Sequence, residues 1–389
     1  MIQRVQIRNY RSLAEVDVNL GPVTVLAGRN GSGKSNFVDA LRFLSDAVNL
    51  GLEAAVMKRK GIGALRRWSK GRPRDVMIAV EGRLPAPSVS YEYTIELGSQ
   101  RGGGFRVKRE AFKGTGGGDR NAEYEVSDGK VVHIEGKGTV RLDEALISST
   151  ALLLTTPLVG SAWTVGRHLS RLSFCSILPN EVREPQKLAQ EYPLAEHGEN
   201  LASLLWDLKE RKPQVLKEIS AALSVAVEGL LGIDVQQAGI GGGGGYLLLT
   251  FDHELAGGGT CTFDASQESD GTLRMLGLLT ALYQVPSPSF LAIEEPELHI
   301  HPGALGVLSD VVREAAQARG TQVLLTTHSP DLLSRFGADE LRAVEVIDGS
   351  THIGLIDSAQ RAAIEQDLFS GGDLLRIEGL YTDRGGVQS

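Results

Sequence analysis

The chain has 389 residues, with 40 basic and 48 acidic side chains and a net charge of −8. At about 150 residues per domain, this length predicts two or three domains, or one core with a large insertion. Its apolar runs are far shorter than a bilayer span and its start lacks the pattern of a signal peptide, so we exclude a transmembrane protein and expect a cytoplasmic one. Cys175 and Cys261 lie far apart with no Cys/His cluster, which excludes a disulfide scaffold and a zinc site.

Three zones follow one another along the chain. Residues 1–50 read as strands, a glycine loop and a helix from about Lys34 to Val48. Residues 51–260 mix antiparallel-looking strands, glycine-rich hairpin tips and a helical stretch over 200–227. Residues 261–389 return to alternating helix and strand. Short apolar strands followed by helices are typical of a parallel sheet covered on both faces, so we predict an α/β fold.

A glycine loop with the pattern G-x-x-x-x-G-K-[ST] spans residues 28–35, after an apolar run and before an amphipathic helix. Glycines let backbone amides turn inward around an anion, and the helix N-terminus adds the positive end of its dipole. We therefore predict that Lys34 reaches the β- and γ-phosphates of ATP and that Ser35 offers a hydroxyl to Mg²⁺. A glycine turn that binds nothing is the alternative. The predicted nucleotide-binding residues of the loop are Asn30, Gly31, Ser32, Gly33, Lys34, Ser35 and Asn36.

Two adjacent carboxylates end the apolar run 290–293, at the edge where open α/β sheets bind ligands. We predict that Glu294 holds Mg²⁺, although an aspartate is usual at this position and glutamate is one methylene longer. Glu295 is the predicted general base for the attacking water. The alternative is a solvated acidic turn.

His328 directly follows the next buried strand, which begins at Gln322, so we expect it at the same sheet edge. An imidazole there can hydrogen-bond a γ-phosphate or the attacking water, whereas a lone histidine would ordinarily be structural. Lys34, Glu295 and His328 form the predicted catalytic set. No further ligand accompanies the H-x-H spacing of residues 299–301, so we predict no metal site there.

One segment is strongly basic and contains no acidic residue. In an acidic protein any contact with DNA must use such a local patch, although a solvated basic loop is an equally good interpretation. The basic residues of the segment are Lys58, Arg59, Lys60, Arg66, Arg67, Lys70, Arg72 and Arg74.

Both ends of the chain resemble the ABC-type ATPases of the SMC, RecF and OLD group. The segments that carry the resemblance are 7–13, 28–36, 266–272, 293–302 and 327–331. The resemblance implies a P-loop ABC-ATPase head with a mixed sheet and an inserted α+β lobe. The halves of the head would be residues 1–50 and 261–389, with the insertion over 51–260. We expect no TOPRIM nuclease domain, because too few residues follow Pro330, and no long coiled coil.

The resemblance further implies a signature segment, Ser269, Asp270, Gly271 and Thr272, that binds the γ-phosphate of ATP held by the other protomer. Two ATP molecules would lie between two copies of the chain in a homodimer. The segment 297–301 would lie at the dimer interface, and Arg11 would approach the nucleotide. A glutamine loop is expected in the insertion, with these candidates left open: Gln100, Gln186, Gln190, Gln214, Gln236 and Gln237.

These features predict an ATPase whose dimerisation and hydrolysis act in DNA repair or maintenance, or in anti-phage defence. The alternative is a nucleotide-gated scaffold that controls a separately encoded effector or nuclease. The motor of a membrane transporter shares the same motifs, but the N-terminal segment 9–12, the large insertion and the His-Ser-Pro ending disfavour it.

Overall fold

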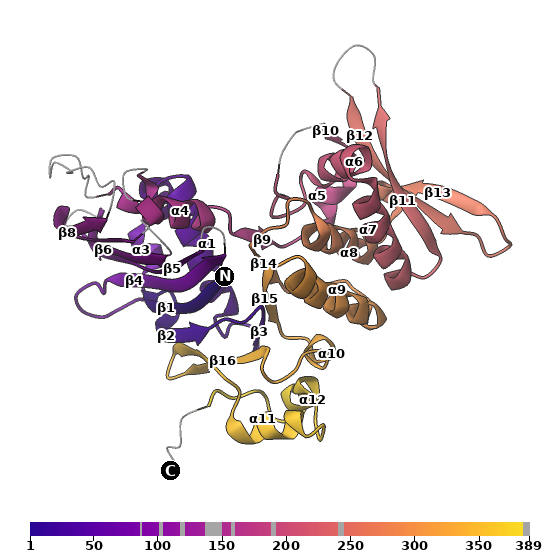
Figure 1. The fold of residues 1–389 in the computed structure, drawn as a ribbon. Helices are drawn as coiled ribbons and strands as arrows, with labels where there is room; N and C mark the ends of the chain where they lie inside the picture. Colours follow the sequence, from indigo (N-terminus) through magenta and orange to yellow (C-terminus); the bar gives the residue numbers. More distant parts are fainter. Residues whose placement is uncertain are drawn as a thin grey trace.

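The computed structural model describes residues 1–85, 88–100, 104–116, 121–136, 150–156, 160–187, 192–239 and 245–383. Most of three predicted glycine tips, and the glutamine candidate Gln190, lie outside the described residues. Figure 1 shows two lobes that rise on either side of a central sheet, with the C-terminal helices beneath it.

The first lobe is a seven-stranded antiparallel sheet, in the order β2-β1-β4-β5-β6-β7-β8. Its strands are β1 (Ile2–Tyr10), β2 (Leu13–Asn19), β4 (Val76–Pro85), β5 (Ser88–Ser99), β6 (Phe105–Gly116), β7 (Ala122–Ser127) and β8 (Lys130–Gly136). Because β4 pairs with β1, the insertion extends a sheet that the N-terminal strands begin. The predicted boundary at residue 50 therefore falls inside this lobe, and residues 51–260 contribute to both lobes.

The central sheet has the order β17-β16-β3-β15-β14-β9, and all its neighbours are parallel except the edge strand β17. Its strands are β3 (Val23–Ala27), β9 (Ser173–Cys175), β14 (Phe290–Glu294), β15 (Gln322–Thr327), β16 (Leu341–Ile347) and β17 (Ser350–Gly354). The sheet joins strands that are about 300 residues apart in sequence, which confirms the predicted α/β class with a mixed sheet.

The second lobe contains a four-stranded antiparallel sheet and several helices. Its strands are β10 (Gln186–Lys187), β11 (Leu230–Ala238), β12 (Tyr246–Glu254) and β13 (Thr260–Asp264). The helices of the whole chain are α1 (Lys34–Asn49), α2 (Leu52–Lys58), α3 (Ile62–Leu65), η2 (Leu153–Thr155), α4 (Gly160–Leu169), α5 (Pro179–Arg183), α6 (Leu201–Arg211), α7 (Pro213–Ala226), η3 (Ala265–Gln267), α8 (Asp270–Tyr283), η4 (Pro302–Ala304), α9 (Leu305–Ala318), α10 (Pro330–Leu333), α11 (Ser358–Glu365) and α12 (Gly371–Ile377).

The helical stretch predicted over 200–227 is two helices, α6 and α7. The break falls at Lys212, whose φ of −142° and ψ of 54° are not helical. Pro213 explains the break, because its ring disfavours helical backbone in the preceding residue and it has no N–H to continue the helix. The same proline suits the first position of α7.

The central strands are buried on both faces, which explains why their sequences are continuous apolar runs. Leu324 and Ala292 face the cluster that fills the first lobe, together with Phe37 and Phe43 of α1. Their neighbours Leu325 and Ile293 face the cluster shared with α8 and α9. Alternation along each strand thus divides the interior into two cores, one on each side of the central sheet.

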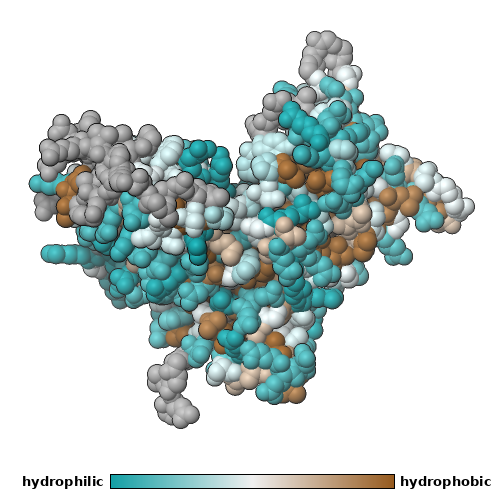
Figure 2. Space-filling model, viewed as in Figure 1, coloured by the Kyte–Doolittle hydropathy of each residue, from teal (hydrophilic) through white to brown (hydrophobic). Residues whose placement is uncertain are grey.

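The face seen in Figure 2 is mainly hydrophilic, with brown apolar groups over the second lobe and near the C-terminal helices. Exposed apolar side chains of the molecule include Val225 of α7 and Leu231 of β11, and, in the segment from α11 to α12, Leu368, Phe369 and Ile377. No helix within the described ranges is long and apolar enough to cross a bilayer.

Candidate functional site

The phosphate loop connects the buried strand β3 to α1, as predicted. Gly31 and Gly33 have φ values of 76° and 105°, in the left-handed region that glycine tolerates best. A Cβ at Gly28 would lie 2.2 Å from the carbonyl oxygen of Val344, so only glycine fits where the loop leaves the sheet. The loop backbone then turns at the N-terminus of a 16-residue helix, whose free amides and dipole favour an anion.

Lys34 is buried inside this loop. Its Nζ donates to the carbonyl oxygens of Gly28 at 2.7 Å and Arg29 at 3.1 Å. Burial lowers the pKa of Lys34, while the nearby carboxylates of Glu295 and Glu297 act in the opposite direction. The ammonium is thus held next to both the loop backbone and the acidic residues that follow β14.

Side chains from other segments stabilise the loop through hydrogen bonds. Thr351 of β17 donates its hydroxyl to the carbonyl oxygen of Ser32 at 2.8 Å and lies 2.7 Å from the hydroxyl of Ser12. The side-chain amide of Asn36 donates to the same Ser12 hydroxyl at 2.7 Å. The Oγ of Ser32 is buried without a protein partner, and Ser35 is exposed where α1 begins. The two serines therefore remain available to a ligand, whereas Asn36 is engaged with the protein.

The two carboxylates reach the same edge of the sheet. β14 and β15 run parallel with Glu294 opposite Thr326, and Thr327 lies opposite Ala27, the last residue of β3. Glu294 accepts a hydrogen bond from Arg42 of α1 at 2.7 Å, and Arg42 also pairs with Glu196 at 2.8 Å. Glu294, the predicted metal ligand, is therefore held against α1, the helix that follows the phosphate loop.

Glu295 turns away from the strand with a φ of 44°, and its N–H donates to the carbonyl oxygen of Thr326 at 3.0 Å. Its Oε1 lies 3.4 Å from Nδ1 of His328. Such strained backbone in a non-glycine residue persists only where its surroundings hold it, and it is commonest at functional sites.

Glu297 is a site residue that the sequence analysis did not single out. Its Oε1 accepts hydrogen bonds from the hydroxyl of Thr327 at 2.6 Å and from the N–H of His328 at 3.1 Å. The same oxygen lies 3.6 Å from the His328 ring, and the carboxylate is only 8% exposed. The resemblance had assigned Glu297 to the interface segment 297–301, but its side chain faces its own site and holds the backbone of His328 in place.

Arg274 of α8 is a second such residue. Its buried guanidinium donates to the carbonyl oxygen of Glu295 at 2.9 Å and to that of Ile177 at 2.8 Å. Because α8 begins at the signature segment, Arg274 ties the backbone of the predicted base to that segment. Nothing in the sequence around Arg274 predicts this contact, because a single arginine within a helix has no distinctive pattern.

The signature segment forms the N-terminus of α8. Ser269 is the N-cap, and its Oγ accepts from the N–H of Thr272 at 3.1 Å. Arg183 pairs with Asp270 at 2.7 Å and lowers the pKa of that carboxyl. A Cβ at Gly271 would lie 2.4 Å from the carbonyl oxygen of His299, so the segments 269–272 and 297–301 pack together. Among the described residues, no hydrogen bond or ion pair joins this signature to the phosphate loop.

Arg11 does not point at the loop in this structure. Its guanidinium pairs with Asp39 of α1 at 2.9 Å, beside the hydroxyl of Tyr10. Of the glutamine candidates, Gln186 is buried and bonds to the backbone of Gly198 and Ala202, which makes it structural. None of the described candidates contacts the phosphate loop through a hydrogen bond.

The basic segment 58–74 offers fewer unpaired basic side chains than its sequence suggests. Arg59 is buried against Asp39 and Asp46, and Lys58 also pairs with Asp46. Arg66 donates to Ser99, and Arg67 donates to Ser12 and Ser350. Four basic side chains of the segment 58–74, all of which the structure describes, carry no ion pair or side-chain hydrogen bond: Lys60, Lys70, Arg72 and Arg74.

The structure thus brings Lys34, Glu294, Glu295 and His328 to one edge of a parallel sheet, although more than 250 residues separate Lys34 from the other three. A glycine loop, two carboxylates and a histidine in this arrangement define the class of P-loop ATPases.

Comparison with known families gives the same class. Residues 168–334 match a family described as "AAA domain, putative AbiEii toxin, Type IV TA system", and residues 1–72 match one described as "AAA ATPase domain". An OLD nuclease of Thermus scotoductus is 42% identical over 41 residues, which are 10% of this chain and 8% of that protein. The DNA replication and repair protein RecF of Brucella abortus is 49% identical over 45 residues, 11% of this chain and 12% of RecF. The chain therefore matches about a tenth of the length of these relatives.

Solved structures extend the likeness to the whole fold. An SMC head bound to the C-terminal winged-helix domain of ScpA aligns with a TM-score of 0.56 at 15% identity, covering 90% of this chain and 97% of that one. An SMC head from Pyrococcus furiosus aligns with a TM-score of 0.54 at 12% identity, covering 94% and 99%. These solved structures show the same fold, and together with the family matches and the short matches to RecF and OLD nuclease they support the resemblance to ABC-type ATPases of the SMC, RecF and OLD group.

Proposed function

We propose that the chain binds ATP in its phosphate loop and hydrolyses it. The observation that carries the proposal is the convergence of Lys34, Glu295 and His328 at one sheet edge. In this proposal Lys34 and the loop amides hold the phosphates, and Glu295 accepts the proton of the attacking water. His328, whose backbone Glu297 holds in place, donates a hydrogen bond to the γ-phosphate or positions the water.

Ser35 and Glu294 suit Mg²⁺, which prefers oxygen ligands and usually takes one or two protein oxygens together with phosphates and waters. The hydroxyl of Ser35 is exposed, and Glu294 Oε1 accepts from Arg42 at 2.7 Å, which fixes the carboxylate beside α1. When bound, the ion would neutralise charge that develops on the phosphates. Ser35 and Glu294 would then orient the ion, and Arg42 would orient Glu294.

We further propose that a second copy of the chain completes each site. The capped N-terminus of α8, with Ser269 and Gly271, has the chemistry of an anion site and, among the described residues, no hydrogen bond or ion pair to its own phosphate loop. A homodimer with two ATP molecules between the subunits would bring this signature onto the partner's γ-phosphate, where hydrolysis in trans requires it.

Ser269→Arg tests this arrangement, because a bulky cation at the cap blocks the signature and leaves the phosphate loop intact. Ser269→Arg and Lys34→Ala subunits should each be inactive alone, since each homodimer lacks one half of both sites. Mixing them should restore phosphate release, because each mixed dimer has one complete site. Normal ATP turnover by the Ser269→Arg homodimer would show that the signature is not used in trans.

The cellular role we propose is DNA repair or maintenance, or anti-phage defence, supported by the short matches to RecF and OLD nuclease. Phosphates of DNA would contact Lys60, Lys70 and Arg72, near the exposed indole of Trp68. Lys70→Gln/Arg72→Gln should weaken duplex binding and flatten its salt dependence by about two charges. Fluorescence anisotropy at several salt concentrations measures both, with Arg109→Gln, which leaves the exposed Arg109–Glu125 pair incomplete, as control.

If the wild-type chain binds no DNA in that assay, the nucleotide-gated scaffold becomes the better proposal. The exposed Leu368, Phe369 and Ile377 around α11 and α12 favour it, because clustered apolar side chains are typical of surfaces that bind a partner.

A further inference from the structure

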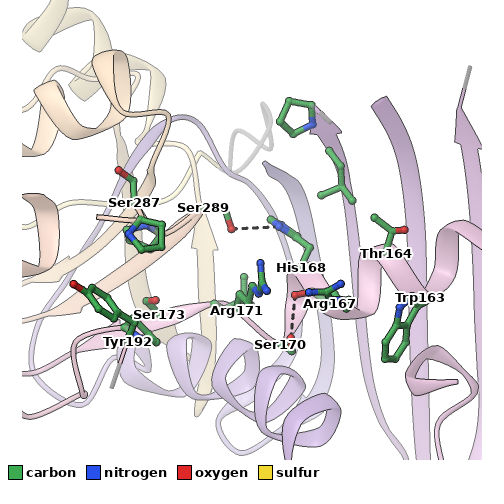
Figure 3. Close-up of a pocket in the computed structure, with 16 residues that line it drawn as sticks. Trp163, Thr164, Arg167, His168, Ser170, Arg171, Ser173, Tyr192, Ser287 and Ser289 are labelled. Carbon is green, nitrogen blue, oxygen red and sulfur yellow. Dashed lines mark hydrogen bonds between the residues drawn. The ribbon is translucent and has the colours of Figure 1, made fainter. Parts of the chain in front are cut away.

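A cavity of about 790 Å³ lies at the opposite edge of the central sheet from the phosphate loop. Ser173 and Ser289, which line it, stand where β9 and β14 begin, whereas Glu294 stands where β14 ends. The other walls come from α4 and the turn after it on one side, and from Tyr192 and residues 286–288 on the other. Figure 3 shows these side chains projecting into the space between the two groups of elements. Its volume is in the range of small-molecule sites.

The charged side chains that line the cavity are Arg167 and Arg171, and the lining contains no carboxylate. Within the described residues neither guanidinium has an ion-pair partner, in a chain whose net charge is −8. Burial, helped by the nearby N-terminal ammonium, lowers the pKa of His168 to about 4, so this residue is a neutral imidazole at pH 7. Two guanidiniums with no carboxylate beside them in the lining would balance the charge of a ligand with two negative charges. The planar geometry of guanidinium also suits phosphate oxygens.

The remaining lining suits a flat ring and hydroxyl groups. Trp163 and Tyr192 are 38% and 39% exposed, and Figure 3 shows them on opposite sides of the two arginines. Ring faces of this kind stack on heterocycles. Ser289 lies 3.3 Å from Nδ1 of His168, whose Nε2 is buried without a protein partner. The serine hydroxyls and this imidazole offer hydrogen bonds to a polar ligand.

We infer that this cavity is a second ligand site, separate from the ATP site, and that it takes the phosphate monoester of a flat heterocycle, the chemistry of a nucleoside monophosphate. The phosphate lies between Arg167 and Arg171, and the ring stacks on Trp163 or Tyr192. The phosphate loop lies at the other end of the strands, so the two sites are separate in space.

Isothermal titration of the full chain with AMP tests the site. Arg167→Gln/Arg171→Gln should weaken AMP binding about a hundredfold, because each charge-assisted contact is worth about tenfold. Lys34→Ala and the charge-matched Lys70→Gln/Arg72→Gln should bind AMP like the wild-type chain. Ribose 5-phosphate and inorganic phosphate should bind more weakly than AMP, since neither carries a ring. Trp163→Leu, a second variant with both arginines intact, should reduce the preference for AMP over ribose 5-phosphate.

Five results would overturn the inference. No AMP binding by the wild-type chain, or unchanged binding by the double arginine variant, would show that the cavity does not hold it. Loss of AMP binding in Lys34→Ala would assign the ligand to the phosphate loop instead. Equal affinity for AMP and inorganic phosphate would show that the heterocycle contributes nothing to binding. Tighter binding of an acidic peptide than of AMP would make the cavity a peptide site.

Discussion

Lys34→Ala is expected to abolish measurable ATP binding. The lysine is buried in the loop with its Nζ near Gly28, and a triphosphate would exchange these carbonyl contacts for charged oxygens. Hydrogen bonds to charged groups contribute roughly 1.5–3 kcal/mol each, so losing two of them weakens binding by about a hundredfold or more. Equilibrium binding of a fluorescent ATP analogue measures the change directly.

Lys113→Ala is the matched control, because Lys113 is an exposed lysine of β6 in the first lobe. It should bind the analogue with wild-type affinity. Thermal unfolding of both variants separates lost binding from lost folding, since Lys34 is buried and its removal also leaves the carbonyls of Gly28 and Arg29 without their donor. A folded Lys34→Ala protein with wild-type affinity would show that the phosphates are held elsewhere.

The parts of the site that could be predicted from sequence are local in the chain. The glycine loop, its strand and its helix are contiguous, and the apolar run 290–293, which ends abruptly in two carboxylates, lies in β14. His328 could be placed because parallel strands bring their carboxyl ends to one edge. The order of these elements then sufficed to bring four side chains together.

The supporting residues could not be predicted, because their roles depend on contacts between distant segments. Thr351 bonds to the carbonyl oxygen of Ser32 across 319 positions, and nothing in its own neighbourhood marks it. Glu297 lies in an acidic turn where any carboxylate would look solvated, yet it is buried against His328. For the same reason the sequence could not show that Arg59 of the basic segment is buried in an ion pair, since its pairing with Asp39 depends on how α2 packs against α1.

The division into lobes also required the structure. The alternating sequence of β4 does not show that this strand pairs with β1, because several other strands of the chain would be equivalent antiparallel partners. Alternation of buried and exposed residues in β5 predicts a strand with one covered face, but not which sheet it joins. The cavity near Arg167 is likewise invisible in sequence, because its walls come from segments more than 100 residues apart.

Glu295→Gln is expected to stop ATP hydrolysis while ATP binding remains. Glutamine keeps the size of the side chain but cannot accept the proton of the attacking water, and loss of a general base typically costs about 10²–10⁴ in rate. The backbone of residue 295 should stay in place, because its N–H and carbonyl are held by Thr326 and Arg274. Removing a negative charge near Lys34 also favours the triphosphate. Phosphate release and nucleotide affinity, measured on the same preparation, give the two readouts.

The same variant reports on the dimer, because hydrolysis is the step that would let the two subunits separate. With Mg-ATP, Glu295→Gln should elute from a sizing column as a dimer, and it should return to its ATP-free size when nucleotide is removed. Glu92→Gln, an exposed carboxylate of β5, is the matched control and should turn over ATP normally. Full turnover by Glu295→Gln would exclude this residue as the base, and Glu297 would then be the nearest alternative, since its carboxylate lies 3.6 Å from the same histidine. If Glu295→Gln binds ATP without hydrolysing it but stays monomeric, the proposal that Glu295 is the base stands and the proposal of a site shared between two subunits is wrong.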